Sequence, residues 1–456
     1  MIKNKLSSKS ITEDFVNWSV NLRADEVPVE VKKKLKMILL DSFGLMIATR
    51  NQKYIKSLMN SFTESGKCFA IGHKQTLSPF DAITINGTAI HGEDFDDTFE
   101  GTPVHIGSVI IPSILAAAQF FNLKSDEIIS GIAIGSELIC RLALVSPTAI
   151  HRQGFHPTAI LGALGASMGI SRAIGNNKNQ TVSALGIVGS MTSGIIEYLA
   201  EGTWTKRLHP GWAAACGWKS SLFGKNNFLG PRTVLEGEHG VFKAFASNKI
   251  NPDFSLINDQ LGLKWYSSDL ALKPYACGTM TQPYIDCAVK VRNELDLENI
   301  SEIICKVGEG TVHRLWEPLV EKQNPSSAYS AKFSVPFCIA IGLKYGKAGL
   351  EEFSDKKIKD KQLLNLASKV KYEIDPNNEY PENYTGEIIV KTNEGKQIQV
   401  IQDGLRGGKK NPMSYNEVEN KFNENLKFGK LNSENHIKIK SFVDTFFEKP
   451  NFKLLI

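Results

Sequence analysis

Histidines stand next to expected helix starts at three places in this 456-residue chain. His105 comes two residues before Gly107, where an apolar run begins, and His156 and His209 each come directly before a proline. Because proline is favoured at the first position of a helix, we expect all three imidazoles at helix N-termini. The unpaired N–H groups and the positive dipole end of such termini bind anions. The pattern is typical of an active site that processes carboxylates.

The chemistry expected of one of these imidazoles can be stated further. A helix N-terminus lowers the pKa of a nearby imidazole, so we expect His105 to be neutral at pH 7 and able to act as a base. Taken singly, each of the three histidines is more often a helix cap or a buried, hydrogen-bonded side chain. Three of them in one domain favour a shared site.

Acidic residues crowd together in the stretch 91–98. Asp94, Asp97 and Thr98 have the spacing i, i+3 and i+4, so on a helix they share one face, while Asp96 points elsewhere. Repulsion between buried carboxylates raises the pKa of at least one of them, which can then relay protons or orient a histidine. The alternatives are helix caps, surface acids or a Mg²⁺ site.

Three basic side chains are candidates for binding an anionic substrate. Lys206 and Arg207 lie in a polar break over residues 201–211. Lys273 opens a segment near residue 270, where the sequence pattern changes and we expect a boundary between two domains. A substrate with two or three carboxylates needs such cations. A single lysine is more often solvated surface, but ligand sites are over-represented at domain interfaces. We therefore predict that Lys206 and Lys273 bind substrate.

The segments that must position these side chains are mostly helical. Ser10 and Glu13 form a capping-box pair, and helical patterns follow one another up to about residue 265. Glycines recur in the patterns over residues 162–169 and 186–194. Because glycine inside a helix costs roughly 1 kcal/mol relative to alanine, their repetition indicates helices whose backbones approach closely.

The pattern changes after about residue 270. Strands are expected over residues 303–307 and 371–374, with a hairpin over 387–402 that turns at 393–395, and helices over 331–345, 415–426 and 433–448. We therefore predict a mainly α fold. A large, discontinuous all-helical domain of residues 1–270 and 404–456 carries a smaller inserted α+β lid domain, residues 271–403.

Composition excludes several other classes of protein. The net charge of +5 is small, and the lysine-rich stretch 356–361 has no interleaved aromatic residues, so no nucleic-acid partner is expected. The 7 cysteines are scattered without a CxxC pair, which suits neither a disulfide framework nor a zinc or iron–sulfur site. The most apolar stretch, 128–145, contains Glu137 and Arg141, so no membrane span is expected. No apolar targeting segment follows the N-terminus, and we predict a cytoplasmic protein.

Eight segments, in order, resemble the MmgE/PrpD family, and they extend over nearly the whole chain. They read NGTAIHGEDFDDT, VHIGSVIIPSILAAAQ, GFHPTAILGALGAS, EGTWTKRLHPGWAAACG, FLGPRTVLEGEHGVFKAF, KPYACGTMTQPYID, AKFSVPFCIAIGL and NPMSYNEVENKF. That family includes 2-methylcitrate dehydratase, cis-aconitate decarboxylase and iminodisuccinate epimerase. The resemblance implies a helical domain closed by an α+β lid, a homodimer, and an active site between the two domains without a metal or iron–sulfur cluster.

Carried over motif by motif, the resemblance implies a particular set of site residues. They are Asp94, Thr98, His105 and His156 as catalytic residues and Lys206 and Lys273 as substrate-binding residues. Two positions depart from the family pattern. Many relatives have a histidine where this chain has Gln282, and the decarboxylase has a tyrosine that aligns with Phe337, which makes decarboxylation the less expected reaction.

The reactions of this family make or break a C–H bond next to a carboxylate or imine carbon. We expect a cofactor-free, metal-independent hydro-lyase acting on 2-methylcitrate or a related citrate-like di- or tricarboxylate. In this hypothesis His105 is the base or its partner, supported by Asp94 and Thr98, and His156 is the acid. The first alternative is an epimerase or isomerase of a small dicarboxylate. The second is a metabolite-binding protein that has kept the fold and lost catalysis.

Overall fold

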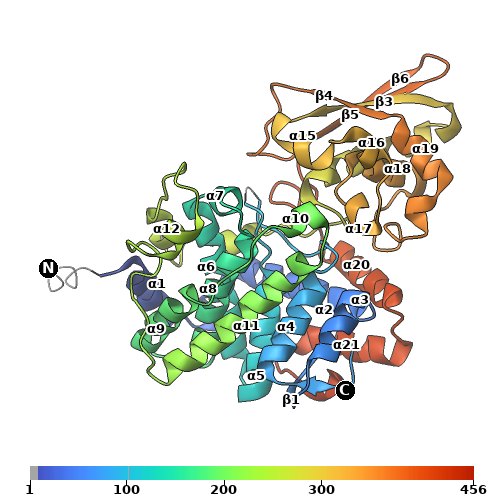
Figure 1. The fold of residues 1–456 in the computed structure, drawn as a ribbon. Helices are drawn as coiled ribbons and strands as arrows, with labels where there is room; N and C mark the ends of the chain where they lie inside the picture. The colour runs from blue at the N-terminus through green and yellow to red at the C-terminus, as the bar shows by residue number, and fades with distance from the viewer. Residues whose placement is uncertain (1–8, 101, 456) are drawn as a thin grey trace. The chain divides into compact units, whose positions relative to one another are not determined.

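The computed structural model describes residues 9–100 and 102–455, and it is mainly helical (Figure 1), which confirms the expected fold class. The chain divides into two compact units. Unit 1 contains the residues up to 92, residues 96–270 and the residues from 419 onward, and unit 2 contains residues 93–95 and 271–418. Residues 1–8, on which the prediction about a targeting segment depends, lie outside the described residues.

Unit 1 is built from helices and one small hairpin. The helices are α1 (Ile11–Ser19), α2 (Val29–Thr49), α3 (Lys53–Ser61), α4 (Pro79–His91), α5 (Gly107–Phe121), α6 (Ser125–Val145), α7 (Ala149–Arg152), α8 (Pro157–Ala173), α9 (Lys178–Gly189), α10 (Tyr198–Glu201), α11 (Thr205–Lys225), α12 (Val241–Phe245) and α13 (Ser255–Asn258). Strands β1 (Ser65–Phe69) and β2 (Thr76–Leu77) pair antiparallel. The expected capping box at Ser10 and Glu13 starts α1.

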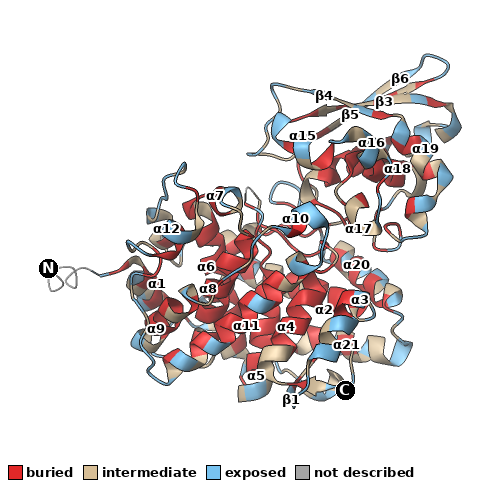
Figure 2. Ribbon diagram, viewed as in Figure 1, coloured by how far each residue is buried: buried red, intermediate tan, exposed pale blue. Residues whose placement is uncertain are grey.

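The core of unit 1 consists of helices that are buried on nearly every side. Figure 2 shows α4, α6, α8 and α11 mostly in the buried colour, and α5 buries every residue from Gly107 to Ala118. A helix that is hydrophobic all round belongs at the centre of a large domain. Such helices give the ends of α4, α5 and α8 a rigid support.

Glycines let two of these helices pack backbone to backbone, as expected. A Cβ atom on Gly135 of α6 would lie 2.9 Å from the carbonyl oxygen of Gly165 on α8, and one on Gly165 would lie 2.2 Å from Ile139. Only glycine fits this crossing without displacing a neighbour.

Helix α6 is long and apolar enough to cross a membrane, yet it is a core helix here. Its mean hydropathy is 1.9, and 89% of the apolar window is buried within the protein. The buried Glu137 and Arg141 pair at 2.8 Å, and Arg141 also donates to backbone carbonyls of residues 256–264. A buried ion pair with its remaining hydrogen bonds satisfied is compatible with a protein interior.

Unit 2 is a four-stranded sheet with helices packed against it. Its strands are β3 (Ile300–Val307), β4 (Val370–Ile374), β5 (Gly386–Thr392) and β6 (Gln397–Gln402), in the order β4-β3-β5-β6, with β3 and β4 parallel and the other pairs antiparallel. Its helices are α14 (Gln282–Val291), α15 (Glu309–Leu315), α16 (Leu319–Gln323), α17 (Ala328–Ala331), α18 (Val335–Tyr345) and α19 (Lys361–Ser368). Helix α14 packs on β5, β6 and α18. The expected strands and hairpin are present.

The chain returns to unit 1 through its last helices, α20 (Tyr415–Phe428) and α21 (Ser433–Thr445). Lys421 of α20 pairs with Asp41 of α2 at 2.7 Å, and both side chains are buried. Residues 404–418, which the sequence analysis assigns to the return segment, group with unit 2. Arg406 accounts for this grouping in part, because it pairs with Asp286 and Glu417 within unit 2.

Two local expectations are wrong. Residues 92–100 and 102–106 form irregular loop segments instead of a helix, so Asp94, Asp97 and Thr98 do not share a helix face. Helix α4 ends at His91, and Asp94 has a positive φ of 54°, which an α-helix does not allow. Helix α11 starts at Thr205, so His209 lies in its second turn and not at its N-terminus.

Candidate active site

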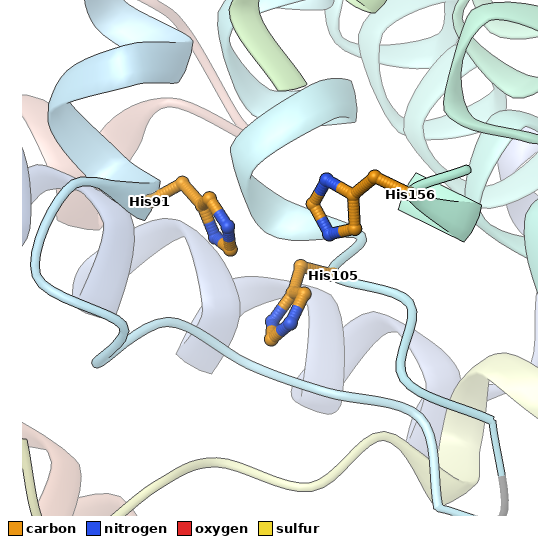
Figure 3. A group of neighbouring side chains, drawn as sticks. All are labelled: His91, His105 and His156. Atoms are coloured by element: carbon orange, nitrogen blue, oxygen red, sulfur yellow. The ribbon is translucent and has the colours of Figure 1, made fainter. Parts of the chain in front are cut away.

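Four buried histidines from four segments of unit 1 lie together, and we call them the histidine cluster. They are His91, at the end of α4, His105, in the loop before α5, His156, directly before α8, and His209, in α11. Figure 3 shows the first three as neighbours, with the ring of His105 below those of His91 and His156. The ring centroids lie 4.6 Å apart for His91 and His105, 5.6 Å for His91 and His156, and 5.4 Å for His156 and His209.

The start of α5 positions His105. The carboxylate of Asp97 accepts hydrogen bonds from the backbone N–H groups of Ile106 at 3.0 Å and Gly107 at 2.8 Å, so it caps the helix. The ring Nδ1 of His105 lies 2.7 Å from the carbonyl oxygen of Asp97. Because a carbonyl only accepts, this nitrogen carries a proton, and Nε2 of a neutral His105 has the lone pair that a base needs.

The start of α8 positions His156. Pro157 opens the helix, and the backbone N–H of His156 donates to the carbonyl of Gly194 at 2.8 Å. The hydroxyl of Thr158, in the first turn, accepts from the backbone N–H of His105 at 3.2 Å. One hydrogen bond therefore joins the two helix starts that carry the histidines.

Two aspartates contact the histidine cluster, Asp96 through its carboxylate and Asp97 through its backbone carbonyl. Asp96 Oδ2 lies 2.9 Å from Nδ1 of His91, and its Oδ1 lies 3.6 Å from Nδ1 of His105, so one carboxylate faces two imidazoles. Burial, and then the charge of Asp96, raise the pKa of Asp97 to about 7, although its two backbone hydrogen bonds oppose the shift. The prediction that at least one aspartate of the stretch 91–98 has a raised pKa is confirmed for Asp97.

Burial and mutual repulsion keep part of the cluster neutral. Burial, followed by the nearby His91 and His209, lowers the pKa of His156 well below its ordinary value. Burial, followed by His91 and the charge of Lys206, lowers the pKa of His209 to about 4. The two rings face each other, with their Nδ1 atoms 3.2 Å apart. Since one of these nitrogens donates and the other accepts, the rings have opposite tautomers.

The other predicted site residues of unit 1 are Thr98 and Lys206, which lie on segments that also carry histidines of the cluster. Thr98 is buried in the loop between α4 and α5, and Lys206 is half-buried in the first turn of α11. Lys206 lies near enough to His156 and His209 for its charge to lower the pKa of each. Unit 1 therefore brings together His105, His156 and Lys206, and it also holds the buried Thr98.

Unit 2 holds the other two predicted residues. The ammonium of Lys273 donates to the carbonyl of Asp94 at 2.9 Å and lies 3.3 Å from its carboxylate. A second buried lysine, Lys332, pairs with Glu93 at 2.8 Å. Both ammonium groups thus hold the short stretch 93–95 within unit 2.

The chain matches two family domains in sequence. Residues 13–253 match the MmgE/PrpD N-terminal domain, and residues 275–445 match the MmgE/PrpD C-terminal domain. This protein belongs to the MmgE/PrpD family. The resemblance in the sequence is thereby confirmed.

Curated relatives of this MmgE/PrpD protein are named for one activity. The chain is 24% identical over 443 residues to the cis-aconitate decarboxylase of Aspergillus terreus, with 91% of this chain and 89% of that protein covered. It is 25% identical to the mouse and 26% identical to the human cis-aconitate decarboxylase, again with 91% of this chain covered and with 87% and 88% of those proteins covered.

Sequence reasoning missed two side chains in this MmgE/PrpD protein. His91 ends an apolar helix directly before the acidic string, and that position is the signal that was available. Lys332 stands between small and apolar residues just before α18, where a lysine is unexpected. Gln282 and Phe337 are both buried in unit 2, and the Gln282 amide donates to the carbonyls of Tyr275 and Cys277.

Proposed function

We propose that this MmgE/PrpD protein is a lyase that acts on a citrate-like di- or tricarboxylic acid. Proton transfer at a carbon next to a carboxylate is the central step. The observation that carries the proposal is the histidine cluster, in which buried imidazoles lie beside a lysine and two helix starts. Burial strengthens each electrostatic interaction with a developing negative charge. The names of the curated relatives support the same class of substrate.

In this proposal His105 removes the proton. Its Nδ1 donates to the carbonyl of Asp97, which leaves Nε2 as the basic nitrogen. When Nε2 accepts the proton the ring becomes cationic, and the carboxylate of Asp96 at 3.6 Å stabilises that charge. The support first expected from Asp94 and Thr98 is thus supplied at least in part by Asp96 and Asp97.

His156 is proposed as the acid that assists the leaving group. A neutral His156 can donate from Nε2 only if its Nδ1 carries no proton, and Nδ1 of His209, 3.2 Å away, can then donate to it. Lys206 and Lys273 are proposed to bind carboxylates of the substrate. Because the pKa of His156 is low, its cationic form is a strong acid but is sparsely populated. We therefore propose that the neutral ring is the donor.

Two reactions compete as the finer assignment. Dehydration of 2-methylcitrate or a close analogue is the first, because it uses a base and an acid and needs no other group. Decarboxylation of cis-aconitate is the second, and the names of the curated relatives favour it. Against it, the resemblance aligns Phe337, which is buried here, with a tyrosine of the decarboxylase.

Incubation in D₂O with 2-methylcitrate, cis-aconitate and iminodisuccinate, followed by NMR, tests the proposal. Loss of water to give an alkene supports the dehydratase, and release of CO₂ with deuterium in the product supports the decarboxylase. Inversion of a stereocentre with deuterium incorporation, but without loss of water or CO₂, moves the assignment to the epimerase. A folded protein that catalyses none of the three reactions, across a wider panel of di- and tricarboxylates, contradicts the proposal.

A further inference from the structure

Three members of the histidine cluster have the composition and spacing of a metal site. One ring nitrogen from each of His91, His105 and His156 lies within 4.8 Å of the other two, and all three residues are buried. Imidazole nitrogens bind zinc, copper, iron and nickel ions in proteins. Zinc in particular is often held by three protein ligands with a fourth position open.

Each of the three rings also has the second partner that metal-binding histidines usually have. Nδ1 of His91 lies 2.9 Å from a carboxylate oxygen of Asp96, and Nδ1 of His105 lies 2.7 Å from a backbone carbonyl. Nδ1 of His156 lies 3.2 Å from the ring of His209. Hydrogen bonds of this kind orient the ring and leave Nε2 as the nitrogen that binds a metal.

His91 supplies an independent observation. Its Nε2 is buried and, within the part of the chain that the structure describes, makes no hydrogen bond. A buried polar atom without a partner costs about 1–3 kcal/mol. The roles proposed above use His105 and His156 and leave His91 without one. A cation bound to this nitrogen would satisfy it, and the carboxylate of Asp96 would offset part of the positive charge.

We propose that Zn²⁺ binds reversibly to Nε2 of His91, His105 and His156 and thereby inhibits the enzyme. Zinc–nitrogen bonds of about 2.0–2.1 Å place tetrahedral ligand atoms roughly 3.3 Å apart, so the rings must turn slightly inward. The bound ion would occupy the lone pair of the proposed base, His105, and hold His156 in the tautomer that cannot donate from Nε2. Metal binding itself does not depend on the proposed function, but inhibition does.

Calorimetric titration of the chelator-treated protein with ZnCl₂, with Co²⁺ as a spectroscopic probe, tests the site. We expect one Zn²⁺ per chain and the visible absorption bands of tetrahedral Co²⁺. The His91→Phe variant should bind Zn²⁺ more than about 100-fold more weakly. The Asp96→Asn variant, which keeps all three ligands, should bind about 10- to 100-fold more weakly. The exposed His239 gives a matched control, and His239→Phe should bind like the unaltered chain.

The possible outcomes separate the two proposals. Stoichiometric binding that the His91→Phe variant loses, in a protein without lyase activity, supports the zinc site and contradicts the proposed function. Turnover that Zn²⁺ does not inhibit, together with no stoichiometric binding, overturns the zinc site and leaves the lyase in place. Equal affinity in the His91→Phe and His239→Phe variants also overturns it. Circular dichroism checks that each variant is folded. If the His91→Phe variant does not fold, the zinc affinity of the Asp96→Asn variant provides the second test.

Discussion

At the scale of single residues, the position of His105 makes it the proposed base. Its removal should therefore lower the turnover number, kcat. The His105→Ala variant should lower kcat by about 10²- to 10⁴-fold, as is typical for a lost general base. Steady-state kinetics on the substrate found in the D₂O experiment measures this. The control is His239→Ala, which removes an exposed histidine. Near-normal turnover in the His105→Ala variant would show that another group is the base.

Lys273 pairs with Asp94 and is also proposed to bind substrate. Two variants can separate its effect on stability from its effect on activity. The Lys273→Met variant should raise KM, lower kcat and reduce stability, because the buried Asp94 carboxylate loses an ammonium 3.3 Å away. Adding Asp94→Asn should restore much of the stability, since the buried negative charge is then removed, but not the activity. Denaturant unfolding and steady-state kinetics on both variants measure the two effects. Recovery of activity in the double variant would argue against substrate binding by Lys273.

Burial makes the thiols unreactive. All 7 cysteines are buried and free, and burial raises the pKa of Cys216 to about 11 and those of Cys68 and Cys287 to about 12. Because the thiolate is the reactive form, a raised pKa reduces its population at any pH below that value. We expect no reaction with a disulfide reagent at pH 8 in the native protein, and reaction of 7 thiols after denaturation. Rapid labelling of a native thiol would contradict this.

At the scale of elements, the crossing of α6 and α8 depends on glycine. Alanine is the better helix former by roughly 1 kcal/mol, yet a Cβ on Gly165 would lie 2.2 Å from Ile139. We expect Gly165→Ala to reduce the free energy of unfolding by about 1–3 kcal/mol through overpacking. Denaturant unfolding, with an unchanged slope, measures this. A stabilised variant would show that helix propensity outweighs the contact.

At the scale of the whole molecule, the homodimer implied by the resemblance stays a prediction. Trp212 and Phe223 lie on one side of α11, 40% and 45% exposed, and give unit 1 an apolar surface. We expect light scattering to report twice the chain mass of 50.4 kDa. Trp212→Glu should shift the protein toward monomer, whereas Leu263→Glu, at an exposed loop position, should not. A monomer at all accessible concentrations would contradict the prediction.

The sequence by itself determined the helix starts and the hairpin turn, which depend on residues adjacent in the chain. Proline before a helical pattern correctly marked the start of α8, and the apolar run after Gly107 marked α5. The turn at residues 393–395 marked the hairpin of β5 and β6. These features follow from local backbone geometry, so a short window of residues carries the information.

Only the tertiary structure decided which side chains meet. Asp97 became a helix cap because its carboxylate reaches the N–H groups of Ile106 and Gly107, and not because of its spacing from Asp94. His91 entered the cluster because the end of α4 packs beside the starts of α5 and α8. Contacts between residues far apart in the chain depend on how helices cross. Crossings depend on the shape of whole surfaces, which no local pattern of residues records.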